Sequence, residues 1–164
     1  MGKRWRRALR FLRRPAREKT LLFESLTLLA WSRLQVRTVP FRWIGKRLGQ
    51  MHVECFEAVD GAAMGRAREI AWAVNAAATH TWWTSNCLPR AMTAQRMLAR
   101  RGLPSTVYLG AAKEDPETMI AHAWLRCGDA MLTGGPGHRR YTVVATFANY
   151  ADDHRWPRGL HHAA

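Results

Sequence analysis

The stretch NCLPRAMTAQRMLARRG, residues 86–102, decides how the rest of the chain is interpreted. Residues 88–101 have the composition of a helix, with Pro89 in the first turn, where its missing N–H breaks no hydrogen bond. Gly102 follows the last arginines, and glycine commonly ends a helix. One side of this helix is apolar and holds Ala91, Ala94 and Leu98. The sequence therefore predicts a helix over residues 88–101.

Short β-favouring runs follow this helix, separated by turn-rich segments. They cover residues 106–109, 120–125, 130–132 and 141–144. Gly128 and Asp129 lie between two of these runs and are typical of a two-residue hairpin turn. The second half of the chain is therefore predicted to be a small antiparallel sheet.

Helices are also expected before residue 86. The first covers residues 20–35 with Thr20 as its N-cap, and a short one follows Pro40 and ends near Gly49. Residues 50–65 look less regular, residues 66–78 are alanine-rich like a helix, and residues 80–86 are predicted to be a loop. The expected fold class is α+β, with helices first and a small antiparallel sheet after them.

The formal charge of +14 is concentrated at the N-terminus. Residues 1–19 carry nine Lys or Arg against one Glu, a charge of +8 that leaves +6 for the rest. Trp5, Leu9 and Leu12 recur at helical spacing among arginines, up to Pro15. This pattern predicts a basic amphipathic helix that contacts a membrane surface or an acidic partner, with a solvated terminus as the alternative. Nucleic acid is the weakest partner, because no nucleic-acid-binding motif accompanies the charge.

Composition limits the compartment and the class of protein. Nearly half of the 164 residues are apolar, which suits one domain with a sizeable core. Cys55, Cys87 and Cys127 have neither zinc-site nor disulfide-framework spacing, so a reducing cytoplasm is expected. No secretory signal is recognisable, and the apolar stretch at residues 21–34 is too interrupted for a membrane span. We expect a cytoplasmic protein, membrane-associated if the tail binds lipid, with no metal or cofactor.

Cys87 and His122 are the candidates for chemistry. Cys87 lies at the start of the predicted helix, where free amides and the helix dipole favour a thiolate; the alternative is a buried structural cysteine. His122 lies in a predicted strand between two alanines; the alternative is a hydrogen-bonded structural histidine. A cysteine at a helix start with a histidine on a later strand is the nucleophile–base arrangement of papain-like and transglutaminase-like enzymes.

The motifs around these two residues resemble the transglutaminase-like B proteins of lasso-peptide biosynthesis. The similar segments lie at residues 86–90, 100–104, 109–110, 121–124 and 132–135, and upstream at residues 21–34, 39–42 and 48–49. The resemblance covers roughly residues 20–147. It implies a transglutaminase-like, papain-like cysteine protease fold over residues 20–150, between a basic tail at residues 1–19 and a C-terminal tail at residues 151–164.

The resemblance also implies that Cys87 and His122 are the catalytic pair of a leader peptidase. The family's third catalytic residue, an acid about twelve positions after the histidine, would fall at Gly134, where this sequence has no carboxylate. Asp129 is expected in the hairpin turn, roughly 20 Å from His122 along an extended strand. In that hairpin register Thr133 and Gly135 are expected nearest to His122, so the Thr133 hydroxyl or a backbone carbonyl remains as the group that orients the imidazole. The third catalytic residue is therefore unassigned.

Two further sets of residues are candidates for substrate contacts. Asn86 and the amide of Cys87 can donate to an oxyanion at the helix start, although Asn86 also suits a helix cap. Trp82, Trp83 and Trp124 can wall a groove for an extended peptide, and core packing is the alternative.

The expected function is removal of the leader from a lasso-peptide precursor: the Cys87 thiolate attacks the peptide bond and His122 protonates the leaving amine. The resemblance implies a separate leader-recognition protein acting in trans, because only about twenty residues precede the similar region, and an ATP-dependent lasso cyclase. Acyl transfer to an amine uses the same residues, and the resemblance favours hydrolysis. The alternative is a non-catalytic adaptor that holds a peptide-maturation assembly on an anionic surface through the basic tail.

Overall fold

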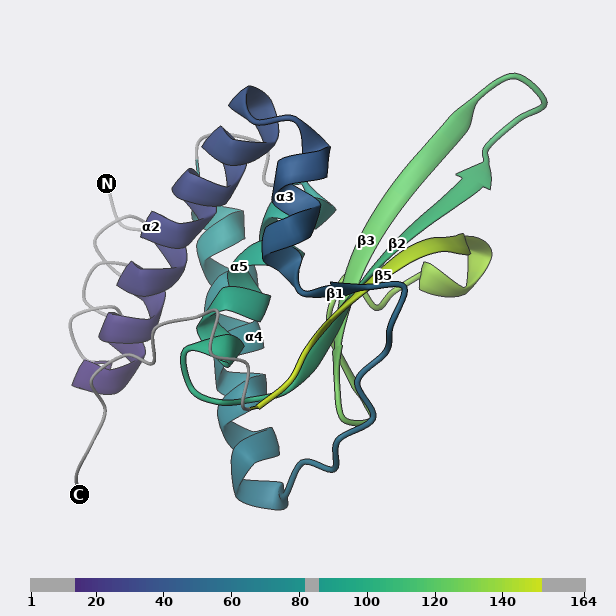
Figure 1. Cartoon of the computed structure of the whole chain (residues 1–164). Coiled ribbons are helices and arrows are strands. Elements are labelled where there is room, and N and C mark those ends of the chain that lie inside the picture. The colour runs from purple at the N-terminus through teal and green to yellow at the C-terminus, as the bar shows by residue number, and fades with distance from the viewer. Residues whose placement is uncertain (1–13, 82–85, 152–164) are drawn as a thin grey trace, which may run out of the picture.

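The computed structural model describes residues 14–81 and 86–151, which form a layer of helices against one antiparallel sheet (Figure 1). The helices are α2 (Ala16–Thr38), α3 (Phe41–Leu48), α4 (Gly61–His80) and α5 (Cys87–Ala99), with a 3-10 turn η1 (His138–Arg140). The strands are β1 (Gln50–Met51), β2 (Ser105–Lys113), β3 (Met119–Cys127), β4 (Ala130–Thr133) and β5 (Thr142–Asn149). The predicted α+β class, with helices followed by a small antiparallel sheet, agrees with this arrangement.

The strands lie in the order β1-β5-β2-β3-β4, and every neighbouring pair is antiparallel. The hairpin predicted at Gly128 and Asp129 is confirmed, because Cys127 pairs with Ala130 across it. Strand β5 begins and ends later than predicted, since its second half pairs with the start of β2 as far as Asn149. The two-residue strand β1 was not predicted.

Helix α2 starts earlier than the sequence suggested. The prediction of Thr20 as the N-cap was wrong: its hydroxyl donates to the carbonyl of Ala16 within the helix, and Pro15 occupies the cap position. The helix therefore includes residues 19 and 20, between which the basic tail was expected to end. The basic amphipathic helix expected over Trp5, Leu9 and Leu12 lies outside the described residues.

Helix α4 also begins earlier than predicted, at Gly61 and not at residue 66. The side chain of Asp60 caps it by accepting a hydrogen bond of 2.7 Å from the amide of Ala63. Two glycines in the first turns made this segment look irregular, because glycine lowers helix propensity. Helix α3 ends at Leu48 with Gly49 as its C-cap, which agrees with the predicted end near Gly49, and α5 ends before Gly102, whose φ is +63°.

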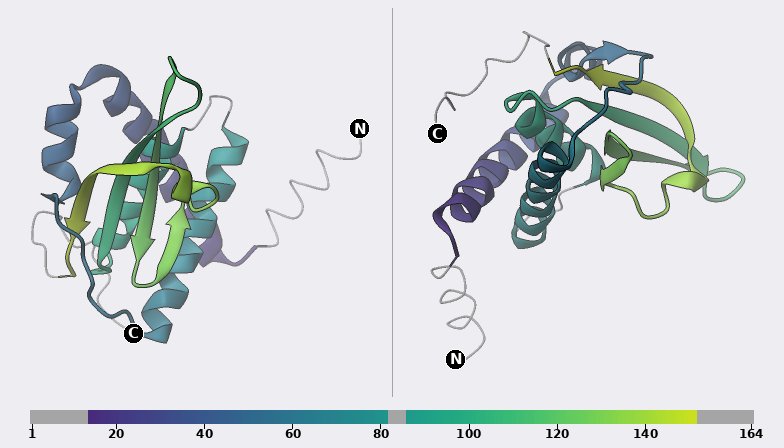
Figure 2. Two further views of the ribbon diagram at one scale, coloured as in Figure 1. Left: turned by 90° about the vertical axis from the view of Figure 1, so that its right-hand side faces the viewer. Right: turned by 90° about the horizontal axis from the view of Figure 1, so that it is seen from below.

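Helix α5 is the centre of the fold. It packs against α2, α4 and strands β2, β3 and β4 (Figure 2), so nearly all of its side chains are buried and not only one side. The largest fully buried apolar residues come from both layers: Leu29, Ile70, Val74, Met92, Met97, Leu98, Val107, Leu125 and Phe147. This placement fixes the start of α5, and with it Cys87, against the sheet.

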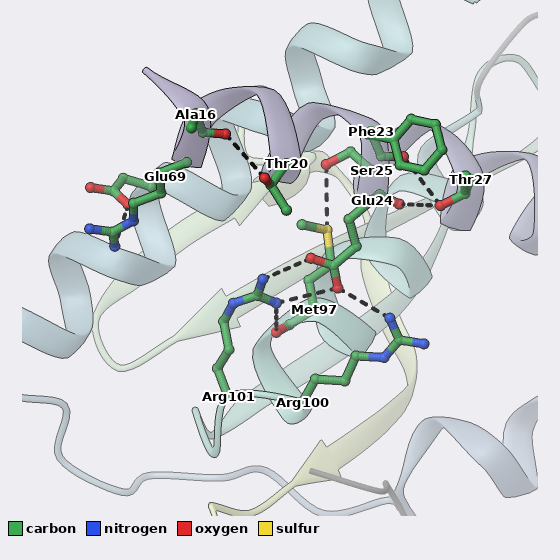
Figure 3. Close-up of polar contacts among 11 residues, drawn as sticks. Ala16, Thr20, Phe23, Glu24, Ser25, Thr27, Glu69, Met97, Arg100 and Arg101 are labelled. Atoms are coloured by element: carbon green, nitrogen blue, oxygen red, sulfur yellow. Dashed lines mark hydrogen bonds and ion pairs between the residues drawn. The ribbon is translucent and has the colours of Figure 1, made fainter. Parts of the chain in front are cut away.

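Polar contacts join α2 to α5. The hydroxyl of Ser25 lies 3.4 Å from the Met97 sulfur (Figure 3), and the Thr93 hydroxyl donates to Ser32 at 3.2 Å. These partners satisfy hydroxyl groups that are costly to bury alone. The two helices are therefore held together by a polar seam.

Glu24 anchors the same seam at the end of α5. Its carboxylate accepts hydrogen bonds from Arg101 at 2.7 Å and from Arg100 at 3.1 Å (Figure 3). Burial opposes ionisation of this carboxyl, but the hydrogen bonds and charges of Arg101 and then Arg100 outweigh it and hold its pKa below the ordinary value. The C-terminal end of α5 is thus fixed to α2.

Candidate active site

Cys87 is the first residue of α5 and is half-buried against the core. Asn86 occupies the N-cap position, but its side chain makes no capping hydrogen bond. A capping side chain normally accepts from the second or third helical amide, and the third residue here is Pro89, which has none. Asn86 is therefore exposed at the helix start and does not cap the helix. Its side chain forms no hydrogen bond with the amides of Cys87 and Leu88.

His122 lies on the sheet face opposite the helices. Side chains alternate along a strand, and its neighbour Ala123 belongs to the core shared with the helices. The imidazole stacks on Trp124, with ring centroids 5.9 Å apart, and on Tyr141 at 5.0 Å. Contacts with two aromatic rings therefore restrict the orientation of the imidazole.

Gly110, which pairs with His122 across β2 and β3, makes room for this stack. A Cβ atom at Gly110 would lie 2.8 Å from the Trp124 ring and 2.8 Å from the Tyr141 Cβ. Real Cβ atoms do not approach other heavy atoms so closely, so any other residue here would displace the rings. Glycine is needed at this position because only a residue without a side chain leaves space for the two rings.

The imidazole of His122 has a defined hydrogen-bond partner. Its Nε2 atom lies 2.8 Å from the backbone carbonyl oxygen of Gly134. A carbonyl oxygen only accepts, so Nε2 carries the hydrogen and Nδ1 of the neutral ring is left as the acceptor. His122 is thus held in a tautomer that can take a proton at Nδ1.

Gly134 stands where the resemblance places an acid, and the position has no space for one. Its φ is +67°, and a Cβ atom there would lie 2.4 Å from the carbonyl oxygen of Ala123. The backbone carbonyl of Gly134 therefore occupies the place of the carboxylate as the imidazole's partner. This matches the backbone-carbonyl option left open by the sequence.

Thr133 and Asp129 do not contact the imidazole. A register shift between Leu125 and Arg126 pairs Thr133 with Leu125, so the expectation that Thr133 lies nearest to His122 was wrong. The Thr133 hydroxyl is buried and has no hydrogen-bond partner among the described residues. Asp129 lies exposed in the hairpin turn, as predicted.

Ideal helix and strand geometry predicts comparable distances of Cys87 and His122 from the turn between α5 and β2. From Ala99 back to Cys87 the helix rises about 18 Å, and β2 extends about 17 Å from Ser105 to Gly110, the partner of His122. Because α5 packs on β2 and β3, both residues are expected at the same level of the sheet. No hydrogen bond among the described residues joins the thiol to the imidazole, and their pairing stays a prediction.

The segment that follows β4 lies along β3 next to His122. Strand β4 pairs with β3 only at residues 125–127, and the following Gly134 accepts the imidazole's hydrogen bond. The ring therefore leans towards this segment. Cys87 packs against the core on the helix side of the sheet, and the imidazole lies on the other face.

The other two cysteines are poor nucleophiles. Burial, followed by the nearby Cys55, raises the pKa of the Cys127 thiol to about 11. Burial also raises the pKa of Cys55. A thiol is nucleophilic as the thiolate, so both side chains are expected to be inert near neutral pH.

A polar cluster that sequence reasoning missed supports the aromatic stack. Tyr108 stacks on Trp124 at 5.5 Å, and its hydroxyl donates to Glu54. Arg126 donates to the Tyr108 hydroxyl at 2.7 Å and forms an ion pair with Glu54 at 3.2 Å. Glu54 lies in an irregular segment far away along the chain, and no local pattern announces the contact.

The tryptophans proposed as a groove wall have different outcomes. Trp124 is buried between Tyr108, His122 and His138, which agrees with the packing alternative. Trp82 and Trp83 lie outside the described residues.

Within residues 14–81 and 86–151, no cluster of three His, Cys, Asp or Glu side chains is suited to a metal ion, and no helix there is long and apolar enough to cross a bilayer.

Comparison with known proteins gave one match. A family profile with the description "Transglutaminase-like superfamily" matches residues 32–146, which include both Cys87 and His122. No curated protein matches the chain, and no solved structure matches it. Members of the matched superfamily are often cysteine-dependent enzymes, and cysteine peptidases are among them.

Proposed function

Because the chain belongs to the transglutaminase-like superfamily, we propose that it is a cysteine peptidase that removes the leader from a ribosomally made lasso-peptide precursor. Cys87 is the nucleophile and His122 the general base and acid of a papain-like arrangement. The observation that carries the proposal is the hydrogen bond from His122 Nε2 to Gly134, which leaves Nδ1 free to accept a proton. The motifs that resemble lasso-peptide B proteins supply the substrate class.

The reaction proceeds through a thioester. The Cys87 thiol gives its proton to Nδ1 of His122, and the sulfur attacks the carbonyl carbon at the leader–core junction. Amides at the start of α5 stabilise the oxyanion. The C–N bond then breaks as Nδ1–H protonates the leaving amine, and a water molecule, deprotonated by His122, hydrolyses the thioester and releases the leader.

The proposed partners follow the same resemblance. A separate leader-recognition protein delivers the precursor in trans, and an ATP-dependent cyclase closes the freed core peptide. Full-rate cleavage by this chain without a partner would contradict the first part of this proposal. The measurement is the initial cleavage rate with and without the candidate recognition protein.

The decisive experiment is cleavage of a candidate precursor by the full chain and its candidate partner, followed by mass spectrometry. Cys87→Ala should abolish the cleaved products, while Cys55→Ser, a change at a buried cysteine away from the helix start, should keep them. Melting curves establish that both variants fold. Unchanged cleavage by Cys87→Ala would refute the assignment.

A non-catalytic adaptor is the second candidate, favoured by the backbone carbonyl that pairs with His122 Nε2 in place of a carboxylate and by the charge of residues 1–19. Alkylation with iodoacetamide near neutral pH separates the two functions. A peptidase should be labelled at Cys87 well before Cys55 and Cys127, whose pKa values are raised by burial. Labelling of Cys87 as slow as that of the buried cysteines would favour the adaptor.

A further inference from the structure

Helix α2 buries Leu21, Leu28 and Leu29, as a surface helix does, but it also exposes large apolar side chains on its opposite side. Its buried side includes polar side chains that are 0%, 0% and 4% exposed: Ser25, Ser32 and Gln35. Its opposite side holds large apolar side chains that are 70%, 38%, 50% and 51% exposed: Phe23, Leu26, Trp31 and Leu34. These four residues are called the α2 outer face below.

The α2 outer face is continuous. Its residues follow Phe23 by three, eight and eleven positions, spacings that return to the same side of a helix. Figure 1 places α2 at the border of the helix layer that is farthest from the sheet. Nothing within the described residues covers this row of side chains.

The buried side of α2 combines these leucines with polar side chains that have hydrogen-bond partners. Ser25 bonds the Met97 sulfur, Ser32 accepts from Thr93, and Gln35 accepts from Arg96 at 2.8 Å. Small or polar residues at a helix–helix interface, with exposed large apolar residues on the outer side, also occur in helices that face lipid. The distribution of side chains on α2 therefore suits a lipid environment on its outer side.

The charge distribution agrees with this environment. Residues 1–47 hold 14 of the 26 Lys and Arg but 2 of the 12 Asp and Glu, so they carry +12 of the formal +14. At the end of α2 and on α3 the exposed cations are Arg37, Arg42, Lys46 and Arg47. None of these four forms an ion pair with a carboxylate of residues 14–81 or 86–151.

We propose that the α2 outer face docks on an anionic lipid bilayer. Phe23, Trp31 and Leu34 enter the boundary between headgroups and acyl chains, and the cations at the α2–α3 junction contact acidic headgroups. A second copy of the chain fits less well, because a contact through α2 would bring together two segments that each carry +12 over residues 1–47. Nucleic acid fits less well too, because phosphate contacts do not use exposed leucines. The proposal does not depend on the chemistry at Cys87.

The test is co-sedimentation of the full chain with vesicles. Vesicles of phosphatidylcholine and phosphatidylglycerol in a two-to-one ratio should bind the protein, and pure phosphatidylcholine should bind it much less. The double variant Phe23→Glu/Leu34→Glu should weaken binding by at least about tenfold, because two apolar side chains leave the interface. Replacing Arg42, Lys46 and Arg47 by Gln should weaken binding and reduce its salt dependence.

Matched variants separate this face from the rest of the molecule. Val144→Glu adds one acid at an exposed apolar residue of the sheet and should leave binding within about twofold of wild type. Neutralising Arg6, Arg7 and Arg10 tests the N-terminal segment. The proposal is overturned if only these three arginines matter, if zwitterionic vesicles bind equally well, or if the double variant dissociates a dimer in solution and leaves vesicle binding unchanged.

Discussion

The two faces of the sheet differ in what their side chains do. The face towards the helices is lined by fully buried apolar groups such as Val107, Leu125 and Phe147. The other face carries the stack of Tyr108, Trp124, His122 and Tyr141 with its hydrogen-bonded ends. Because side chains alternate along β3, Ala123 and Leu125 pack in the core, whereas His122 and Trp124 lie on the face that carries the candidate site. Substitutions on neighbouring positions should have different consequences.

The largest effect is expected for His122→Ala. Loss of the general base should lower the rate of precursor cleavage by about a thousandfold, because the proposed mechanism transfers the thiol proton to this imidazole alone. The melting temperature should change little, since the side chain is outside the helix-side core. A cleavage assay and a melting curve on the same preparation measure both quantities; a large loss of stability would show that the imidazole is structural.

The next largest effect should appear on the opposite face, at Leu125→Ala. Removal of this fully buried side chain should lower the free energy of unfolding by about 3 kcal/mol. Cleavage per folded molecule should stay close to wild type. Denaturant unfolding measures the stability, and the cleavage rate divided by the amount of folded protein measures the activity. Equal losses of activity in His122→Ala and Leu125→Ala would show that the two faces of the sheet do not have separate roles.

Gly134→Ala tests the partner of the imidazole. The new Cβ would lie 2.4 Å from the Ala123 carbonyl oxygen in a positive-φ conformation, so the loop has to move. We expect a loss of about 2 kcal/mol in stability and a cleavage rate that falls further than this instability explains. Gly137→Ala is the control, because a Cβ there meets nothing within 4 Å although its φ is also positive. Similar rates for both variants would exclude a role for the Gly134 carbonyl.

The smallest effect at neutral pH should come from Tyr108→Phe, which removes one hydroxyl and costs about 1 kcal/mol. Burial, followed by the hydrogen bond to Glu54, raises the pKa of Tyr108 to about 12. The folded state therefore favours the protonated phenol, and this stabilisation is complete below about pH 10 and lost as the pH rises towards 12. Unfolding measured between these pH values should depend less on pH in Tyr108→Phe than in wild type.

Local signals allowed much of the fold to be predicted. Pro89 and Gly102 mark α5, Pro40 and Gly49 mark α3, and Gly128 marks the β3–β4 turn. Asp60 is an N-cap residue type and was a usable signal for the start of α4. The prediction missed it because the glycines that follow lower helix propensity. Strand β1 is set by its long-range pairing with β5, and a two-residue strand has no pattern of its own.

The candidate site could be predicted in its parts but not in its geometry. The sequence indicates a cysteine at a helix start and a histidine on a strand. The bond from His122 to the carbonyl of Gly134 depends on the register shift in the β3–β4 hairpin, which leaves no compositional signal. The network of Glu54, Tyr108 and Arg126 likewise joins segments that are distant along the chain.

The cramped backbone at Gly134 also limits how this protein can evolve. An aspartate at this position would need a different backbone path, because the Ala123 carbonyl occupies the volume of any side chain there. A single codon change is therefore expected to damage the site before it can improve the base. Acquiring an acidic partner for His122 would first require an insertion that lengthens the loop after β4.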